Sequence, residues 1–387
     1  MKQLLMVALL SATLSAESFE AFLQSAVERS PFLKASHLQV EQSTYEGSAL
    51  TRYENPNLEV EASYFNPDVG DGDIGYRASY AQPIRLWGVG DNKEELADAN
   101  VALSKANYTQ SRAAFERDIS LQYIKYVESN KMLVLAFEEL SIASNIFKIS
   151  EARYEAGSVS RGIMLQAKVD LNMVVARVQT LKLTKQRYYY NLLKNAGITE
   201  EISLDTEHTF EYKTSVSAEN PEILQLENRQ KSALANAEVN TNKVEWMRLV
   251  GEYEKEPNQD IFRFGASIPL AFFNTKTQER QIATLEAQRS EMLNANAQNQ
   301  LSIELKRLDF ESEALARLQE IDEEILKDEE ELLKMYESGY KIANINLLAL
   351  QDAKSRLVET KERLIKIKIE RDRNAIIQNY LQGNYND

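Results

Sequence analysis

Very few side chains in this sequence are of types that could perform catalysis. The chain contains no cysteine, which excludes disulfides, thiolate metal sites and catalytic thiols. Its histidines are His37 and His208. Carboxylates are abundant, but they lie on strongly acidic segments that give no evidence of tuned acid–base pairs. No glycine-rich phosphate loop is present. We therefore expect no enzyme activity, no bound cofactor and no resident metal.

Some groups could still bind cations, and each has a simpler explanation. Glu200-Glu201 and Glu207-His208 offer carboxylate and imidazole ligands, but they fall in a connector between helices. His37 stands in the middle of a helical pattern, as a surface or packing residue does. The run 320–331 contains eight acidic residues. It could attract cations as an acidic ring or serve only as a solvated helix face, and both interpretations stay open.

Composition and charge point to long helices and away from nucleic acid. The formal net charge is -14, whereas phosphate binding requires clustered Lys and Arg. There are only 13 Gly and 7 Pro in 387 residues, a composition typical of long helices.

The first residues read as an export signal. Lys2 precedes a short apolar run that ends in small residues, so we predict a signal peptide at 1–16 with cleavage after Ala16. The alternative is a buried N-terminal helix. The apolar run is too short for a transmembrane helix, so entry into a membrane would require a β-barrel.

The sequence contains two copies of one plan. Three motifs recur in the same order, at separations of 190, 186 and 182 residues, which indicates an internal duplication. We place the first repeat at 17–197, a connector at 198–217 and the second repeat at 218–387. The paired segments are 30–33 with 220–224, 81–86 with 267–272, and 154–157 with 336–339.

Each copy is predicted to contain a helix, a strand pair and a long helical hairpin. Apolar residues at spacings of three and four run through 91–154 and 278–336, which predicts two very long amphipathic helices. Return helices are expected at 163–195 and 346–380, so the hairpin tips fall near 154–162 and 336–346. Rods of this length must pack along partners of equal length.

The strand pairs show a strict period of two. Segments 57–83 and 246–269 each read as a hairpin whose polar and apolar residues alternate. We expect lipid to contact Leu58, Val60, Phe262 and Phe264. The lumen or its rim should receive Glu59, Glu61, Arg77 and Arg263, because charges on a lipid face are costly. Four strands leave open edges, whereas three chains would pool twelve strands and close a barrel. The alternative is a soluble four-stranded sheet.

The order of these parts resembles the outer membrane efflux protein (TolC) family over nearly the whole mature chain. The resemblance rests on segments 154–160, 165–167, 82–84 and 268–270. It implies a mainly α chain with a small β part. It further implies a homotrimer with a periplasmic α-helical barrel and a twelve-stranded transmembrane β-barrel in outer-membrane lipid. Its partners would be a periplasmic adaptor protein and an inner-membrane efflux pump. The short loops and the Gln-Pro-Ile and Ile-Pro-Leu signatures are most similar to the branch serving heavy-metal cation pumps.

The resemblance also implies a role for the hairpin tips. By position, the adaptor would dock at the two Tyr-x-x-Gly turns, through Tyr154, Gly157, Ser158, Tyr336, Gly339 and Tyr340. Glycine suits such reversals because it tolerates positive φ, so both glycines could also be purely structural. Lys341 occupies the place of a basic residue that helps to close the tip. Its acidic partner is absent, and Ile163 stands near that position.

Two classes of function are compatible with these features. The first is the outer-membrane channel of a tripartite efflux system, a passive duct that carries metal cations or another small cargo. The second is a periplasmic coiled-coil adaptor or scaffold that never enters the membrane. The four alternating segments favour the duct, because a scaffold has no need of aromatic-rich hairpins at matching points of two repeats.

Overall fold

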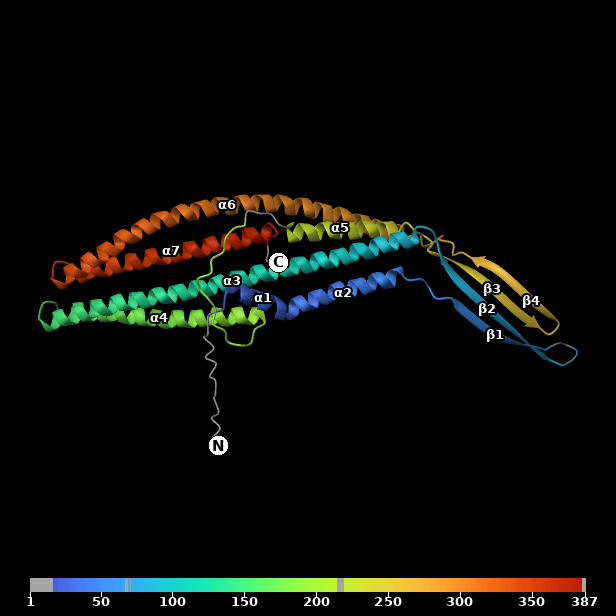
Figure 1. Cartoon of the computed structure of the whole chain (residues 1–387), viewed down its shortest axis with the longest axis horizontal. Helices are drawn as coiled ribbons and strands as arrows, with labels where there is room; N and C mark the ends of the chain where they lie inside the picture. Colours follow the sequence, from blue (N-terminus) through green and yellow to red (C-terminus); the bar gives the residue numbers. More distant parts are fainter. Residues whose placement is uncertain (1–16, 67–68, 70, 214–218, 385–387) are drawn as a thin grey trace, which may run out of the picture. The chain divides into compact units, whose positions relative to one another are not determined.

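The computed structural model describes residues 17–66, 69, 71–213 and 219–384, so the predicted signal peptide at 1–16 lies outside the described residues. The described chain is mainly helical and has one antiparallel four-stranded sheet, which confirms the predicted fold class (Figure 1). It divides into two compact units, and both sequence repeats contribute to each of them. One unit comprises 1–33, 112–220 and 301–387, and the other 34–111 and 221–300.

The first unit is helical. It contains α1 (Phe19–Arg29), α4 (Arg161–Ala196), α7 (Leu347–Leu381) and the corresponding parts of α3 (Val89–Glu155) and α6 (Thr277–Lys341). Polar side chains cap the starts of α1, α4 and α7: Ser18, Ser160 and Asn346 each accept a hydrogen bond from the backbone N–H three residues on. Gly197 ends α4 with φ 72°, a left-handed conformation that suits glycine.

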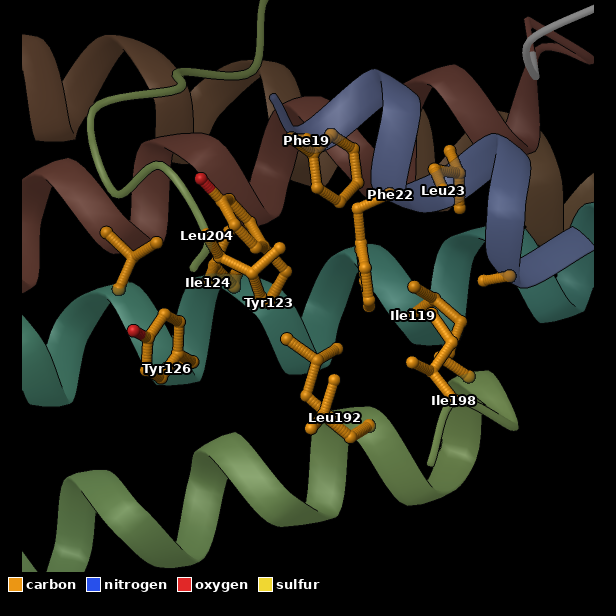
Figure 2. Close-up of a cluster of buried hydrophobic side chains, with 14 of the residues drawn as sticks. Phe19, Phe22, Leu23, Ile119, Tyr123, Ile124, Tyr126, Leu192, Ile198 and Leu204 are labelled. Carbon is orange, nitrogen blue, oxygen red and sulfur yellow. The ribbon is translucent and has the colours of Figure 1, made fainter. Parts of the chain in front are cut away.

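The two largest apolar clusters of this unit join the two sequence repeats. In the first, Figure 2 shows Phe19, Phe22 and Leu23 of α1 pointing toward Ile119 and Tyr123 of α3. The second lies near the hairpin tips and combines α3, α4, α6 and α7 through Ile146, Ala167, Leu333 and Leu350. Because residues of both repeats form each cluster, neither hairpin could bury its apolar seam alone.

The second unit carries the sheet. Its complete elements are α5 (Pro221–Val239), β1 (Asn57–Phe65), β2 (Asp73–Arg85), β3 (Trp246–Glu256) and β4 (Gln259–Ser267), together with most of α2 (Pro31–Thr51). Proline begins both α2 and α5, where its missing N–H carries no cost. The strand order is β1-β2-β3-β4, so β2 of the first repeat pairs with β3 of the second. No described helix is apolar over a stretch long enough to cross a membrane.

The two hairpin tips match at a separation of 186 residues, and the predicted pairing at 182 is wrong there. Helix α3 ends at Glu155 and α6 at Lys341, while the N-caps of the return helices are Ser160 and Asn346. The N–H of Gly157 bonds to the carbonyl of Tyr154, and that of Ala343 to the carbonyl of Tyr340. The two acceptors are therefore also 186 residues apart.

This register changes the role of Gly339. The left-handed residues of the two tips are Gly157 (φ 71°) and Ala343 (φ 65°), whereas Gly339 lies inside α6. A Cβ on Gly339 would come within 2.6 Å of Ile345 Cγ1, so this glycine provides space for the returning chain and not a positive φ. The Tyr-x-x-Gly pattern occurs at both tips, which made Gly339 look equivalent to Gly157 in the sequence. A shift of one helical turn preserves the amphipathic pattern, so the sequence did not reveal the difference.

We predict that substitution destabilises the fold at one left-handed position and not at the other. Gly157→Ala should destabilise the fold by about 1 kcal/mol, because a side chain at positive φ meets the backbone. Ala343→Gly should not destabilise it, since the strain it relieves offsets the added freedom of the unfolded chain. Thermal unfolding, monitored by circular dichroism, measures the effect of both substitutions. Gly162→Ala is the control, because its Cβ would meet only Ser160 Oγ at 3.6 Å. Equal losses at Gly157 and Gly162 would contradict the assignment.

Candidate functional site

The sheet has one apolar face and one charged face. Directly paired residues of neighbouring strands share a face, and the register aligns Val60 with Ala78, Ala78 with Tyr253, and Tyr253 with Phe262. The rings of Tyr253 and Phe262 lie 5.0 Å apart. An apolar row therefore crosses all four strands on this face.

The opposite face carries ion pairs. Arg77 is aligned with both Glu61 and Glu254, and it forms an ion pair with Glu61. Arg263 is aligned with Glu252 and bonds to that carboxylate and to Glu254, the latter at 2.5 Å. This face thus carries four carboxylates, Glu59, Glu61, Glu252 and Glu254, and two guanidinium groups, so it is strongly polar and has an acidic excess in its centre.

The structure places the predicted strand residues on two faces. Leu58, Val60, Phe262 and Phe264 lie on the apolar face, and Glu59, Glu61, Arg77 and Arg263 lie on the charged one. The Phe264 side chain is 88% exposed within the chain. An exposed aromatic row of this kind marks a surface that contacts something other than water.

The sheet also has two open edges. Strands β1 and β4 each pair on one side only, so each presents a row of backbone N–H and C=O groups along its outer side. Such edges act as templates for pairing with another strand. Both edges of the sheet can therefore accept a further strand.

The first hairpin tip is an exposed surface. Tyr154, Gly157 and Ser158 are all exposed, and the N–H of Ser158 closes the turn by bonding to the carbonyl of Arg153 at 2.7 Å. The second tip has the same closure one repeat later, from Asn344 to the carbonyl of Gly339 at 2.9 Å. Both tips thus present short, well-defined turns, and the second also exposes the apolar side chain of Ile342.

In the second tip one predicted contact residue is misplaced. Tyr340 is 1% exposed, its hydroxyl lies 2.8 Å from the Ser150 hydroxyl, and the Arg153 guanidinium stacks on its ring at 4.6 Å. Tyr340 therefore packs beneath the tip and cannot contact a docking partner directly. Tyr336 and Gly339 are only partly exposed, whereas Lys341 is exposed at the end of α6.

A buried ion network between the hairpins was missed at the level of sequence. Lys354 of α7 has a side chain that is 2% exposed, and its ammonium donates to both oxygens of Asp170 in α4, at 2.8 and 2.7 Å. Arg177 of α4 bonds to Glu139 of α3 at 2.9 Å and also to Glu362 of α7. The network therefore connects α3, α4 and α7.

One sequence signal could have revealed it. Lys354 interrupts the apolar stripe Leu350, Leu357, Leu364 at helical spacing, where a further apolar residue is expected. A lone charge in such a stripe needs a buried partner of opposite sign, because an unpaired buried charge is very costly. The identity of that partner depends on the packing of the other hairpin.

The connector residues considered as metal ligands serve packing. His208 lies in an aromatic cluster with Phe19 and Phe210, and its Nδ1 is 3.1 Å from a Glu20 carboxylate oxygen. Glu200 bonds to Arg29. Among the described residues no group of three or more His, Cys, Asp or Glu side chains could hold a metal ion. The connector is instead attached to α7, where the N–H of Phe210 donates to Asp372 at 3.1 Å.

We predict that breaking the Lys354–Asp170 pair is much worse than removing it. Lys354→Met should destabilise the fold by about 3 kcal/mol, since it leaves carboxylates partly buried without their cation. Combining it with Asp170→Leu should recover most of that loss. Denaturant unfolding of the two single variants and the double variant measures the coupling. Purely additive losses would show that the pair does not act as a unit.

We also predict a pH-dependent effect of Asp372. Burial raises the pKa of the Asp372 carboxyl above its ordinary value, although the Phe210 N–H, Lys131 and His208 oppose that shift. The folded chain then binds this proton more tightly than the unfolded chain. The stability that the protonated Asp372 carboxyl contributes is therefore lost as pH rises from the ordinary carboxyl range through the pKa of this group in the folded chain.

Asp372→Asn should accordingly be more stable than the wild type at neutral pH and equal to it near pH ~3, where the carboxyl is protonated. Thermal unfolding at both pH values measures the difference. Asp98→Asn on the exposed surface of α3 is the matched control. A stabilisation that is the same at both pH values would refute the titration argument.

Comparison with known proteins agrees with this arrangement of parts. Residues 22–195 match the family model described as outer membrane efflux protein. No individual curated protein matches the chain significantly. The solved structure of CusC aligns at TM-score 0.80 and 14% identity, over 94% of this chain and 91% of that one. The outer-membrane channel OprN aligns at 0.79 and 14%, over 95% and 90%. VceC, an outer membrane protein of Vibrio cholerae, aligns at 0.79 and 14%, over 94% and 95%. By sequence, residues 22–195 match the outer membrane efflux protein family, and the chain has the fold of solved outer-membrane channels.

Proposed function

We propose that the whole chain is a member of the outer membrane efflux protein family and one protomer of a trimeric outer-membrane duct. The two-faced, open-edged sheet is the observation that carries this proposal. Its apolar face is suited to lipid and its charged face to a water-filled lumen. Its edges require neighbouring strands, and three chains would supply twelve strands in a closed barrel.

The helical hairpins supply the remainder of the duct. Three copies of the α3–α4 and α6–α7 hairpins would surround a common passage continuous with the barrel lumen. The role of the chain in transport is then passive, since binding and release of cargo at the pump set the direction of transport. This is consistent with the lack of any candidate catalytic group in the sequence.

The exposed hairpin tips indicate where partner proteins would bind. A periplasmic adaptor would dock on the short turns around Ser158 and Asn344, and an inner-membrane pump would deliver cargo through it. Metal cations are the cargo class that the short loops and proline signatures favour. Growth of a deletion strain across metals, dyes and detergents would decide between cargo classes.

The membrane assignment can be tested by thiol accessibility. The chain has no native cysteine, so single cysteines can be introduced without interference. Phe264→Cys should resist water-soluble maleimide in native outer membranes, while its neighbour Arg263→Cys should react, because the two side chains lie on opposite faces. In detergent-denatured chains both should react equally, which is the control.

Two outcomes would contradict the duct. The reverse labelling pattern would overturn the assignment of faces. Release of the protein with the soluble periplasmic fraction, without detergent, would support the alternative of a periplasmic scaffold. Its sheet would then have to bury the apolar face against another protein.

Docking at the tips gives a separate prediction. Ser158→Arg and Asn344→Arg place a bulky charge on exposed, equivalent positions of the two turns, without disturbing a left-handed residue. Each variant should assemble and reach the outer membrane normally yet lose most export. Gly157→Val should instead reduce assembly, since it strains the turn. Export assays at matched protein levels test this, and full export by both Arg variants would place docking elsewhere.

A further inference from the structure

One carboxylate joins several segments in the region where the strands meet the helices. In the second unit the chain passes between helix and strand four times, and all four passages, here called crossings, lie at the same end of the sheet (Figure 1). The crossings are 52–56 before β1, 86–88 after β2, 240–245 before β3 and 268–276 after β4. The last is the longest and leads out of an edge strand, so the chain itself constrains the attachment of β4 least.

Glu245 is the group that connects three of these crossings. Its carboxylate accepts one hydrogen bond from Lys93 Nζ and one from Lys276 Nζ, each at 2.6 Å and each to a different oxygen. Its backbone carbonyl accepts the N–H of Leu86 at 3.0 Å. Burial by itself would raise the pKa of the Glu245 carboxyl, but the bonds from the two lysines hold that pKa below its ordinary value. Glu245 is therefore an ionised bridge between the starts of α3 and α6.

Both lysines occupy positions that are unfavourable for a helix start. Lys276 immediately precedes α6 and Lys93 lies near the start of α3, where the helix dipole disfavours positive charge. Lys276 also has φ 51°, a left-handed conformation that costs free energy in a residue other than glycine. Helix stability therefore does not explain these two residues, whereas a carboxylate that both ammonium groups must reach does explain them.

A neighbouring arginine fixes the remaining crossing. Arg85, the last residue of β2, donates to the backbone carbonyls of Thr51 at 2.8 Å and Arg52 at 2.6 Å, at the end of α2. Its guanidinium also lies over the rings of Tyr53 and Trp246, at 4.5 and 4.9 Å from their centroids. Trp246 directly follows Glu245, so the two sets of contacts are continuous along the end of the sheet.

We propose that Glu245 is a positioning residue for assembly: through Lys276 it orients β4 so that the free edge of this strand can pair with a strand of the next copy. The inference rests on the trimeric duct proposed above and adds what prepares one chain for barrel closure. A barrel closes only when tilt and stagger agree across all its strands. An edge strand on a long crossing meets that condition only if the far end of the crossing is fixed, and Lys276 fixes it.

The two lysines should differ in what they control. The crossing 86–88 is short, the Leu86 N–H already holds it, and β2 is paired on both sides. Lys93 therefore adds stability but little orientation, whereas Lys276 determines where an edge strand points. The side chain of Lys93 is 12% exposed and that of Lys276 is 21% exposed, with bonds of equal length. A purely stabilising role would thus make Lys93 at least as important as Lys276.

The first test compares the two lysines. Lys276→Met should lower the fraction of chains recovered as heat-resistant trimers by about tenfold, the effect of losing one hydrogen bond between charged groups. Lys93→Met, the matched control, should leave that fraction unchanged although it removes an equivalent bond. Detergent gels of unboiled samples at matched protein levels measure the fraction. Circular dichroism should show the same helix content in both variants.

The second test changes the carboxylate. Glu245→Gln should reduce trimers at least as much as Lys276→Met, because the amide has one acceptor oxygen for two ammonium groups. Glu54→Gln is its control, since Glu54 lies at the same end of the sheet and forms only an exposed pair with Arg248 at 3.6 Å. Glu245→Lys alone should abolish trimers. Combining it with Lys93→Glu and Lys276→Glu should restore them, because the bridge is rebuilt with reversed charges.

The outcomes separate this inference from the proposed function. Normal trimers in Lys276→Met, equal losses in the two Lys→Met variants, or no recovery in the triple variant would overturn the positioning role and leave the duct intact. If Glu245→Gln lowers helix content and so fails to fold, the comparison of the two lysine variants decides. A wild-type protein that is a stable monomer in mild detergent would instead overturn the duct itself.

Discussion

The unpaired backbone at the two sheet edges is the constraint on which the rest of this molecule depends. Four strands cannot close on themselves, and β1 and β4 each leave a row of N–H and C=O groups without strand partners among the described residues. In water such edges invite uncontrolled pairing, and in lipid they cannot be tolerated. The proposed trimer would complete the sheet with strands of other copies. The segregation of apolar and charged residues onto opposite faces fits that assembly.

The helices also depend on specific partners, which they select through buried apolar seams and ion pairs. Helices α3 and α7 bury their seams inside the unit, and Lys354 of α7 is buried there against the partly buried Asp170 of α4. A buried ion pair adds little net stability, but its members tolerate few other partners, so it favours one pairing of the hairpins. Within the unit, charge therefore favours one pairing of the hairpins, whereas apolar contacts supply most of the stabilisation.

These features suit the proposed role in transport, which requires no catalytic group. A duct needs a stable wall, a lumen that accepts water and cargo, and a surface on which its partners assemble. In the proposed duct the charged face of the sheet lines the lumen, and its ion pairs keep that surface polar. The short tips are the proposed docking surfaces, because Ser158 and Asn344 present equivalent turns at the ends of both hairpins. The proposed function therefore depends on geometry and assembly.

The sequence by itself determined the local elements of this protein. Its periodicities of two and of three to four predicted the strands and long helices, and its internal repeat predicted two equivalent hairpins, because side-chain direction along a regular backbone depends only on spacing. The tertiary structure alone decided the tip register, the burial of Tyr340 and the partners of Lys354. A shift of one helical turn leaves an amphipathic pattern almost unchanged, so Gly339 appeared equivalent to Gly157 until the backbone placed Ala343 there. Burial and ion pairing depend on which segments distant in sequence pack together, and periodicity within one segment carries no information about that choice.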